Sequence, residues 1–204
     1  MSAGSGSVIA QTLSVTGNVQ GSVTYAVTPS LNGCSGTTVY YTVLVNPAPT
    51  PDLADGHICV NQSTGTTYQT YTLQSGVPAA GHVFEWFFNG TTPIAGATGP
   101  NYTADQAGTY TVEVRDIVTN CEGTATANVT IVYPATSFVT TVTDAFTGNA
   151  TITVTVTQPG SGNLVYSLDG GAWQDSNVFT NVEAGEHVVA VGDLEGCTYL
   201  EDTV

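Results

Sequence analysis

The stretch Gly108-Thr-Tyr-Thr-Val-Glu-Val-Arg-Asp-Ile-Val-Thr-Asn-Cys121 decides the fold. Tyr110, Val112 and Val114 alternate with polar residues, and this alternation is typical of a β-strand with one buried face. After the turn that follows, a second alternating run leads back, so the stretch predicts an antiparallel β-hairpin. Hairpins of this kind recur along the chain, with cysteines at their tips: Cys34, Cys121 and Cys197. The recurrence predicts an array of small β domains.

The composition argues against several classes of protein. Charged residues make up only 8% of the chain, and 16 acidic residues against one basic residue give a net charge of −15. Phosphate backbones and anionic lipid heads repel such a chain, so we expect no nucleic-acid partner. No stretch approaches the ~18 continuous apolar residues of a membrane helix, so we expect no membrane insertion. The chain contains no lysine, which excludes an isopeptide staple, a Schiff base and a lysine general base.

The four cysteines predict disulfides in an oxidising compartment, because no CxxC pair and no zinc-ligand spacing occurs. We predict a disulfide between Cys59 and Cys121, which would stabilise the fold by about 4 kcal/mol on the chain-entropy estimate. Cys34 and Cys197 are each expected to be a free thiol or to have a partner outside the chain. Residues 1–7 lack the features of a signal peptide, so we expect the chain to be an excerpt of a longer secreted protein.

The expected fold class is all-β, with tandem immunoglobulin-like β-sandwich domains of which the first is incomplete. The first domain, residues 1–47, has about three predicted strands, one of them near residues 8–15. Three strands are too few for an independent sandwich. We favour a truncated domain whose earlier strands and second cysteine lie upstream of Met1. The alternative is a compact three-stranded cap in which Cys34 is a free thiol.

The second domain, residues 48–133, follows a proline-rich connector and has roughly seven short predicted strands, as an immunoglobulin-like sandwich requires. Trp86 lies in the middle of one strand, and Tyr110 follows Asp105, an arrangement that resembles the tryptophan and tyrosine corner of such folds. The third domain, residues 134–204, is predicted to contain a tight hairpin turn at Asp169-Gly170, because primed turns need positive φ.

Two segments resemble known repeat families. The run Tyr166-Ser-Leu-Asp-Gly-Gly-Ala-Trp173, followed by Gly185-Glu-His-Val-Val-Ala-Val-Gly192 and Glu195-Gly-Cys197, is similar to the SprB-type repeats of very large gliding-motility and surface adhesins of Bacteroidota. Residues 2–47 resemble the C-terminal half of PKD-like repeats from such proteins, and the second domain resembles their Ig-like modules. The resemblance implies long secreted cell-surface β arrays, exported by the type IX system. It implies no catalytic residues.

Few residues suggest a chemical site. We expect no enzyme and no catalytic residue, because no nucleophile elbow, HExxH or phosphate loop occurs. Calcium is the one cofactor considered: Asp52, Asp55 and Asp116 offer hard oxygen ligands near a domain junction. Ordinary solvated carboxylates are the alternative interpretation. His57 and the nearby Asp55 would together provide only two ligands, so they are a weak candidate for a metal site.

Two surface positions are candidates for glycan chemistry. Trp173 could stack on a sugar ring, although a tryptophan at such a hairpin also serves as the core plug of a small sandwich. Thr203, in Asp202-Thr203-Val204, resembles a short O-glycosylation motif of Bacteroidota.

The function expected is a structural stalk or filament segment of a secreted adhesin that spaces a distal binding region. The expected partners are neighbouring domains of the same protein or copies of the chain. One alternative is a carbohydrate-binding module that depends on Trp173, and another is a segment that accompanies a catalytic domain. A third is a filament subunit that assembles by strand complementation between chains, because an incomplete first domain exposes unpaired strand edges.

Overall fold

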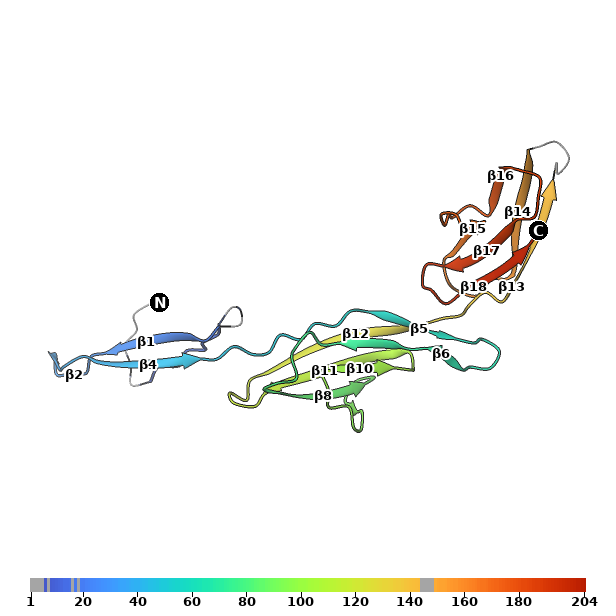
Figure 1. Cartoon of the computed structure of the whole chain (residues 1–204). Coiled ribbons are helices and arrows are strands. Elements are labelled where there is room, and N and C mark those ends of the chain that lie inside the picture. Colours follow the sequence, from blue (N-terminus) through green and yellow to red (C-terminus); the bar gives the residue numbers. More distant parts are fainter. Residues whose placement is uncertain (1–5, 7, 16, 18, 144–148) are drawn as a thin grey trace.

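The computed structural model describes residues 6, 8–15, 17, 19–143 and 149–204, and all regular structure in these ranges is β. The strands form three groups that follow one another along an elongated molecule (Figure 1). No helix in the described ranges is long and apolar enough to cross a membrane. The prediction of an all-β fold is confirmed.

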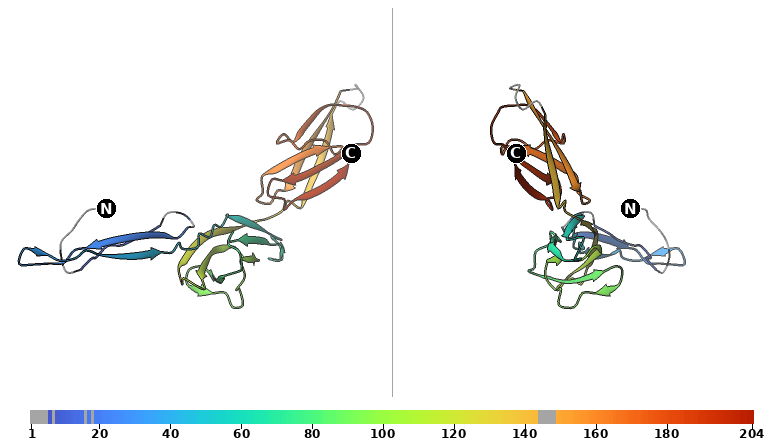
Figure 2. Two further views of the ribbon diagram at one scale, coloured as in Figure 1. Left: turned by 60° about the vertical axis from the view of Figure 1, so that its left-hand side comes forward. Right: turned by 90° about the vertical axis from the view of Figure 1, so that its right-hand side faces the viewer.

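The first group of strands is a long hairpin that projects from the rest of the molecule (Figures 1 and 2). Its strands, in chain order, are β1 (Gly21–Val27), β2 (Ser30–Leu31), β3 (Cys34–Ser35) and β4 (Val39–Val45). β1 pairs with β4 in regular antiparallel register, and β2 pairs with β3 at the tip. Asn32 and Gly33 form the tip turn with φ of 51° and 82°, the positive values that a primed turn requires.

The strand predicted near residues 8–15 does not form. This segment has no strand pairing, and it is tied to the hairpin by the Tyr25 hydroxyl, which donates to Gln11 Oε1 at 2.9 Å. Val8 and Ile9 are 78% and 58% exposed. A strand is stabilised by a partner edge and by a buried face, and this segment has neither.

The second group is an immunoglobulin-like sandwich. Its strands are β5 (Gly56–Val60), β6 (Thr67–Gln69), β7 (Tyr71–Gln74), β8 (His82–Phe88), β9 (Thr92–Pro93), β10 (Asn101–Ala104), β11 (Gly108–Asp116) and β12 (Glu122–Val132). The larger sheet has the order β6-β5-β12-β11-β8-β9, and the smaller one pairs β10 with β7. β5 runs parallel to β12, and the other neighbours are antiparallel.

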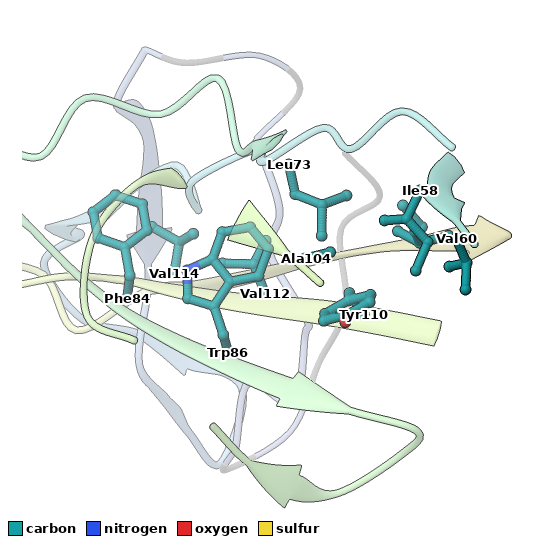
Figure 3. Close-up of a cluster of buried hydrophobic side chains, with 11 residues drawn as sticks. Ile58, Val60, Leu73, Phe84, Trp86, Ala104, Tyr110, Val112 and Val114 are labelled. Carbon is teal, nitrogen blue, oxygen red and sulfur yellow. The ribbon is translucent and has the colours of Figure 1, made fainter. Parts of the chain in front are cut away.

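The core of the second group follows the predicted alternation of β11. Tyr110, Val112 and Val114 are at most 2% exposed, and Val112 lies opposite Trp86 in the register of β8 and β11 (Figure 3). Trp86 is fully buried and its indole N–H donates to the carbonyl of Gly99 at 2.9 Å. The Tyr110 hydroxyl donates to the Gln106 carbonyl four residues upstream, as in a tyrosine corner.

The third group is a smaller sandwich. Its strands are β13 (Ser137–Thr143), β14 (Ala150–Gln158), β15 (Leu164–Leu168), β16 (Val178–Val182), β17 (Val188–Asp193) and β18 (Tyr199–Thr203). One sheet has the order β13-β14-β16 and the other β15-β17-β18. Valines and isoleucine from β14 and β17 meet in the core, which includes Ile152, Val154, Val189 and Val191. Asp169 and Gly170 have φ of 51° and 68°, as the predicted turn requires.

The connector between the first two groups packs closely on the second sandwich. A Cβ added to Gly123, at the start of β12, would lie 1.9 Å from the carbonyl oxygen of Pro49. Only glycine therefore permits this approach of the connector to the sheet. Each sheet contains strands from one group alone. The exact domain boundaries, at 47/48 and 133/134, stay a prediction.

Candidate functional site: the disulfide-linked junction

A disulfide between Cys59 and Cys197 links the second and third groups of strands, with a Cα–Cα distance of 5.5 Å and a sequence separation of 138. Cys59 lies in β5 and is fully buried, and Cys197 lies in the turn between β17 and β18 at 7% exposure. The prediction of a Cys59–Cys121 bridge is therefore wrong, and so is the expectation that Cys197 is free or paired outside the chain.

The geometry of the second sandwich explains why Cys121 is out of reach. β5 is parallel to β12, and Cys59 lies beside Val132, the last residue of β12. Cys121 directly precedes the first residue of that 11-residue strand. At about 3.3 Å per residue the two cysteines lie roughly 33–36 Å apart, whereas a disulfide needs Cα atoms within about 7 Å. Cys59 can therefore only pair with a residue that approaches the outgoing end of the sandwich.

Hydrogen bonds cross the junction beside the disulfide. His57 Nε2 donates to the carbonyl of Glu195 at 2.7 Å, and the Tyr68 hydroxyl donates to the carbonyl of Cys197 at 2.6 Å. On the side of the third domain, the backbone N–H of Ala135 donates to the buried Thr198 hydroxyl at 2.8 Å and fixes the entering chain to the turn that carries Cys197. Val132 forms a small buried cluster with Cys59 and Cys197. The junction therefore combines a disulfide, hydrogen bonds and apolar packing.

The acidic residues of the junction are held by specific donors. Partial burial raises the pKa of Glu195. Hydrogen bonds from the backbone and side chain of Asn163 outweigh this effect and hold the pKa below its ordinary value. Asp193, 8% exposed, accepts the backbone N–H of Cys197 at 2.7 Å through Oδ1. Burial and the charge of Asp193 both raise the pKa of Tyr68, which therefore stays a neutral donor. These contacts position the 193–198 turn that carries Cys197.

His57, Cys59 and Cys197 also form a group whose potential ligand atoms lie within 4.8 Å of one another. Zinc binds cysteine as thiolate, and the two sulfurs here are bonded to each other. The group is therefore a disulfide with a neighbouring histidine. His57 was only a weak metal candidate in the sequence, and the structure gives it a hydrogen-bonding role instead.

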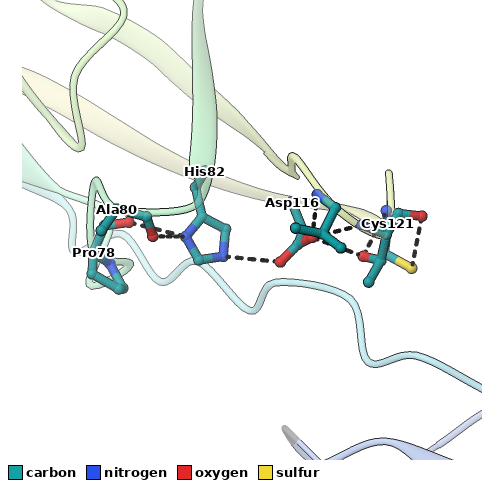
Figure 4. Close-up of polar contacts among 7 residues, drawn as sticks. Pro78, Ala80, His82, Asp116 and Cys121 are labelled. Carbon is teal, nitrogen blue, oxygen red and sulfur yellow. Dashed lines mark hydrogen bonds and ion pairs between the residues drawn. The ribbon is translucent and has the colours of Figure 1, made fainter.

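The proposed calcium ligands lie apart and have separate contacts. Asp116 Oδ1 accepts the backbone N–H groups of Val118 and Thr119, which lower the pKa of Asp116, and its Oδ2 lies 3.9 Å from His82 Nε2 (Figure 4). Asp55 Oδ1 accepts the N–H of Asn128 at 2.7 Å. Among the described residues, Asp52, Asp55 and Asp116 do not form a group with metal-binding spacing. Calcium binding stays a prediction without geometric support.

The two remaining cysteines are free thiols. Cys34 is exposed at the tip of the first hairpin, and Cys121 is partly exposed in the turn between β11 and β12. The backbone N–H of Cys121 donates to the Thr119 hydroxyl, and its carbonyl accepts the N–H of Asp116 (Figure 4). Its contacts are those of a turn residue.

Trp173 lies on the surface of the third sandwich. It is 47% exposed, and its ring meets Tyr199, itself 64% exposed, edge-on at 6.4 Å between centroids. Gly192 lies beneath it, since a Cβ there would be 3.1 Å from the indole. The alternative of a buried core plug is therefore wrong. Glu201, next to Tyr199, accepts the hydroxyl of that tyrosine. The sequence identified the tryptophan but did not indicate the aromatic partner.

Two other positions are placed without a clear role. Thr203 is exposed in β18, which leaves the proposed O-glycosylation untested. His187 forms a hydrogen bond with the turn at Asp169, and its Nδ1 lies 2.7 Å from Asp169 Oδ2. That hydrogen bond raises the pKa of His187 and lowers the pKa of Asp169. The expectation that the chain is not an enzyme stays a prediction.

A known protein family matches the segment that contains the first group of strands. Residues 1–49 match the family described as PKD-like domain, which confirms the resemblance of this segment to PKD-like repeats. The similarity of the third unit to SprB-type repeats, and an origin in Bacteroidota, stay predictions. No curated protein sequence matches the chain.

Several solved multidomain structures are similar to the chain at low sequence identity. The N-terminal eight Ig domains of Down Syndrome Cell Adhesion Molecule share 14% identity over 82% of this chain and 29% of theirs, with a TM-score of 0.39. A titin fragment shares 13% over 85% of this chain and 70% of its own, with a TM-score of 0.44. Drosophila OTK extracellular domains 3–5 share 7% over 89% and 68%, with a TM-score of 0.40. The immunoglobulin-like assignment itself rests on the strand order and core of the second sandwich.

Proposed function

We propose that this chain is a load-bearing spacer segment of a secreted cell-surface adhesin, which holds a distal binding region away from the surface. The match to PKD-like domains and the tandem β-sandwich architecture support an extracellular array. A disulfide that persists requires an oxidising compartment, which supports secretion. Gliding motility and type IX export remain part of this proposal through the sequence resemblance alone.

The Cys59–Cys197 disulfide is the observation that carries the proposal. Tension applied to the two ends of the chain reaches Cys59 near the start of the second sandwich and passes directly through the sulfur atoms to Cys197. Residues 60–196, which include almost all of both sandwiches, then lie outside the path of the load. A segment built in this way keeps its length under force even if a sandwich loosens. This is the property that a spacer needs.

The non-covalent contacts at the junction serve the same role. The bonds from His57 and Tyr68 to the 195–197 turn hold that turn against the second sandwich. Because they act on the same short turn as the disulfide, they oppose rotation about it. A junction with both kinds of contact is stiffer than a single connector at residues 133–135.

Single-molecule force extension tests the spacer role. The full chain is pulled from both ends under oxidising conditions and compared with the Cys59→Ser/Cys197→Ser double variant. Removal of the disulfide should add about 450–500 Å of contour length, since 138 residues each extend by roughly 3.3–3.6 Å. Cys34→Ser is the control and should leave the contour length unchanged. Equal contour lengths for the wild type and the double variant would contradict the shielded-load mechanism.

A carbohydrate-binding role is the second candidate, and the exposed Trp173–Tyr199 pair favours it. A half-exposed indole next to a second aromatic ring and the carboxylate of Glu201 offers a stacking surface with a hydrogen-bond acceptor. Calorimetric titration with a panel of soluble oligosaccharides tests this candidate. Binding that Trp173→Ala abolishes and Trp173→Phe retains would support it. The absence of binding to the wild type would rule it out for the panel used.

A further inference from the structure

The β1–β4 hairpin leaves two strand edges without a partner. In the described part of the chain, β1 pairs only with β4, and the register between them has no bulge. Natural proteins protect such edges with charges, prolines or bulges. Between residues 21 and 45 there is no charged side chain, and the single proline, Pro29, lies near the tip. The edge of β4 is therefore open to pairing.

The hairpin also has an apolar face that nothing in the described chain fully covers. The register places Val23 opposite Val43, Tyr25 opposite Tyr41 and Val27 opposite Val39, all on one face. Tyr41 is 60% exposed, and no described residue before residue 46 is buried. Residues 8–15 cover only part of this face, along a groove lined by Ile9, Gln11, Leu13, Tyr25, Tyr41 and Val43. A two-stranded hairpin alone is marginally stable, so this face favours a partner.

The distribution of charge indicates what that partner is. Every Asp, Glu, Lys and Arg of the chain lies at or after Asp52, so the net charge of −15 belongs entirely to the remainder of the molecule. The hairpin lies at the end away from the third sandwich (Figures 1 and 2). An uncharged edge offers no electrostatic recognition to a charged partner. Two copies can meet hairpin to hairpin while their acidic bodies, which repel each other, point apart.

The sequence of β4 is self-complementary in an antiparallel pair. Val-Tyr-Tyr-Thr-Val-Leu-Val has its centre at Thr42, with apolar residues at matching distances on both sides. With Thr42 opposite Thr42 of the second copy, Val39 meets Val45 and Tyr41 meets Val43. Each pair keeps its side chains on the same face of the sheet, as register requires. β1 is the poorer edge, because it contains Gly21 and Ala26 and because Val15 lies against Gly21.

We propose that two copies of this chain associate through β4, in antiparallel register about Thr42, to form a four-stranded sheet with the order β1-β4-β4-β1. Its apolar face is twice as wide as that of one hairpin and combines the Tyr25–Tyr41 pairs of both copies. This inference goes beyond the spacer role and does not depend on it. It gives this chain a surface for self-association.

Light scattering of the full chain over a range of concentrations tests the proposal. The mass of the wild type should rise from 20.9 kDa toward twice that value. Thr42→Lys and Thr42→Glu should each remain monomeric, since the two-fold places like charges directly opposite each other. An equimolar mixture of the two variants should regain the dimer, because Lys then faces Glu.

Thr24→Lys is the matched control. Thr24 is the cross-strand neighbour of Thr42 on the same face, and their hydroxyl oxygens lie 2.9 Å apart. The control therefore loses the same contact and gains the same charge, but away from the β4 edge, and it should still dimerise. Cys34→Ser should also dimerise, which separates strand pairing from an intermolecular disulfide.

Several results would overturn the proposal. A wild type that is monomeric at every concentration would show that the edge has a different partner or none. Dimerisation of Thr42→Lys alone, or failure of the mixed variants to associate, would exclude the register about Thr42. Loss of the dimer in Cys34→Ser would assign association to a disulfide. None of these results affects the force-extension test, so failure of this inference and failure of the spacer role remain distinguishable.

Discussion

The β1–β4 hairpin and the β11–β12 hairpin have the same pairing and opposite environments. Both form regular antiparallel pairs, and β1 and β11 each alternate apolar with polar or small residues. In β11, Val112 and Val114 are fully buried, whereas in β4 Val39 and Val43 are 47% and 41% exposed. The difference is a second sheet: β7 and β10 cover β11, and no described strand covers β4. Alternation determines which face is apolar, and tertiary structure determines whether that face is buried.

The largest expected effect concerns the disulfide. The β11–β12 hairpin lies within the loop that the disulfide closes, and the β1–β4 hairpin lies outside it. Cys59→Ser/Cys197→Ser should lower the free energy of unfolding by about 5 kcal/mol on the chain-entropy estimate for its 138-residue separation. Urea unfolding under non-reducing conditions measures it. Cys34→Ser should have no effect. A comparable loss in Cys121→Ser would indicate that Cys59 pairs with Cys121 after all.

Truncation of a large side chain should lower the free energy of unfolding much more in the buried sandwich than in the exposed hairpin. Trp86→Ala should lower the free energy of unfolding by about 3–5 kcal/mol, because it removes a fully buried indole that packs on Val112. Tyr41→Ala, in the exposed hairpin, should change it by less than about 0.5 kcal/mol. Urea unfolding at a concentration at which the chain is monomeric provides both numbers. Similar losses for the two variants would mean that the first hairpin has a packed core.

Removal of one hydroxyl group gives a finer comparison. Tyr110→Phe should cost about 1 kcal/mol, because the hydrogen bond from the buried Tyr110 side chain to the Gln106 carbonyl is lost. Burial raises the pKa of Tyr110 to about 12, so its hydroxyl is neutral and donates over the whole working pH range. Tyr25→Phe removes the bond to Gln11 on the exposed hairpin and should cost almost nothing. The same unfolding assay applies, and a loss of equal size in Tyr25→Phe would contradict the comparison.

The smallest expected effect is electrostatic: the stability of a turn in the third sandwich should depend on pH, whereas the hairpin, which has no charged residue, should show no such dependence. The hydrogen bond between Asp169 and His187 lowers the pKa of Asp169 from 3.8 and raises the pKa of His187 from 6.5. The contribution of Asp169 is therefore present above pH 3.8 and lost as the pH falls through its lowered pKa. The contribution of His187 is present below pH 6.5 and lost as the pH rises through its raised pKa. The pair stabilises the turn most between these two ordinary values.

Backbone NMR measures this titration. The amide of Val188, which donates to Asp169 Oδ1 at 2.8 Å, should shift at both ends of that pH window, and the amide of Thr42 should not. In His187→Gln the upper transition should disappear while the lower one remains. An unchanged upper transition in that variant would assign it to a different group.

The sequence was sufficient for the local features. The alternation of Tyr110, Val112 and Val114 correctly predicted their shared buried face, and Asp169-Gly170 correctly predicted a turn with positive φ. The tyrosine corner was also found from sequence through Asp105 and Tyr110, and the structure gives its acceptor as the Gln106 carbonyl. These features depend on residues that are neighbours along the chain, or on side chains that restrict the local backbone.

The candidate site was predicted less well, because it depends on segments far apart in the sequence. Cys59 was assigned to Cys121 because both fall in one domain, and the parallel pairing of β5 with β12 carries Cys59 to the opposite end. That pairing leaves no signal in the sequence of either strand. Trp173 was recognised as an aromatic at a hairpin, but its exposure and its contact with Tyr199 depend on Gly192 in a different strand.

The sequence by itself determined an all-β chain with no charged residue before Asp52 and acidic residues from there on, together with the alternating strands and positive-φ turns of its sandwiches. Those properties follow from side-chain periodicity, backbone preference and charge, which act over a few residues. Only the tertiary structure decided which apolar faces are covered and which cysteines meet. Burial and disulfide pairing depend on the position of each segment in space, and in this protein the relevant partner is up to 138 residues away.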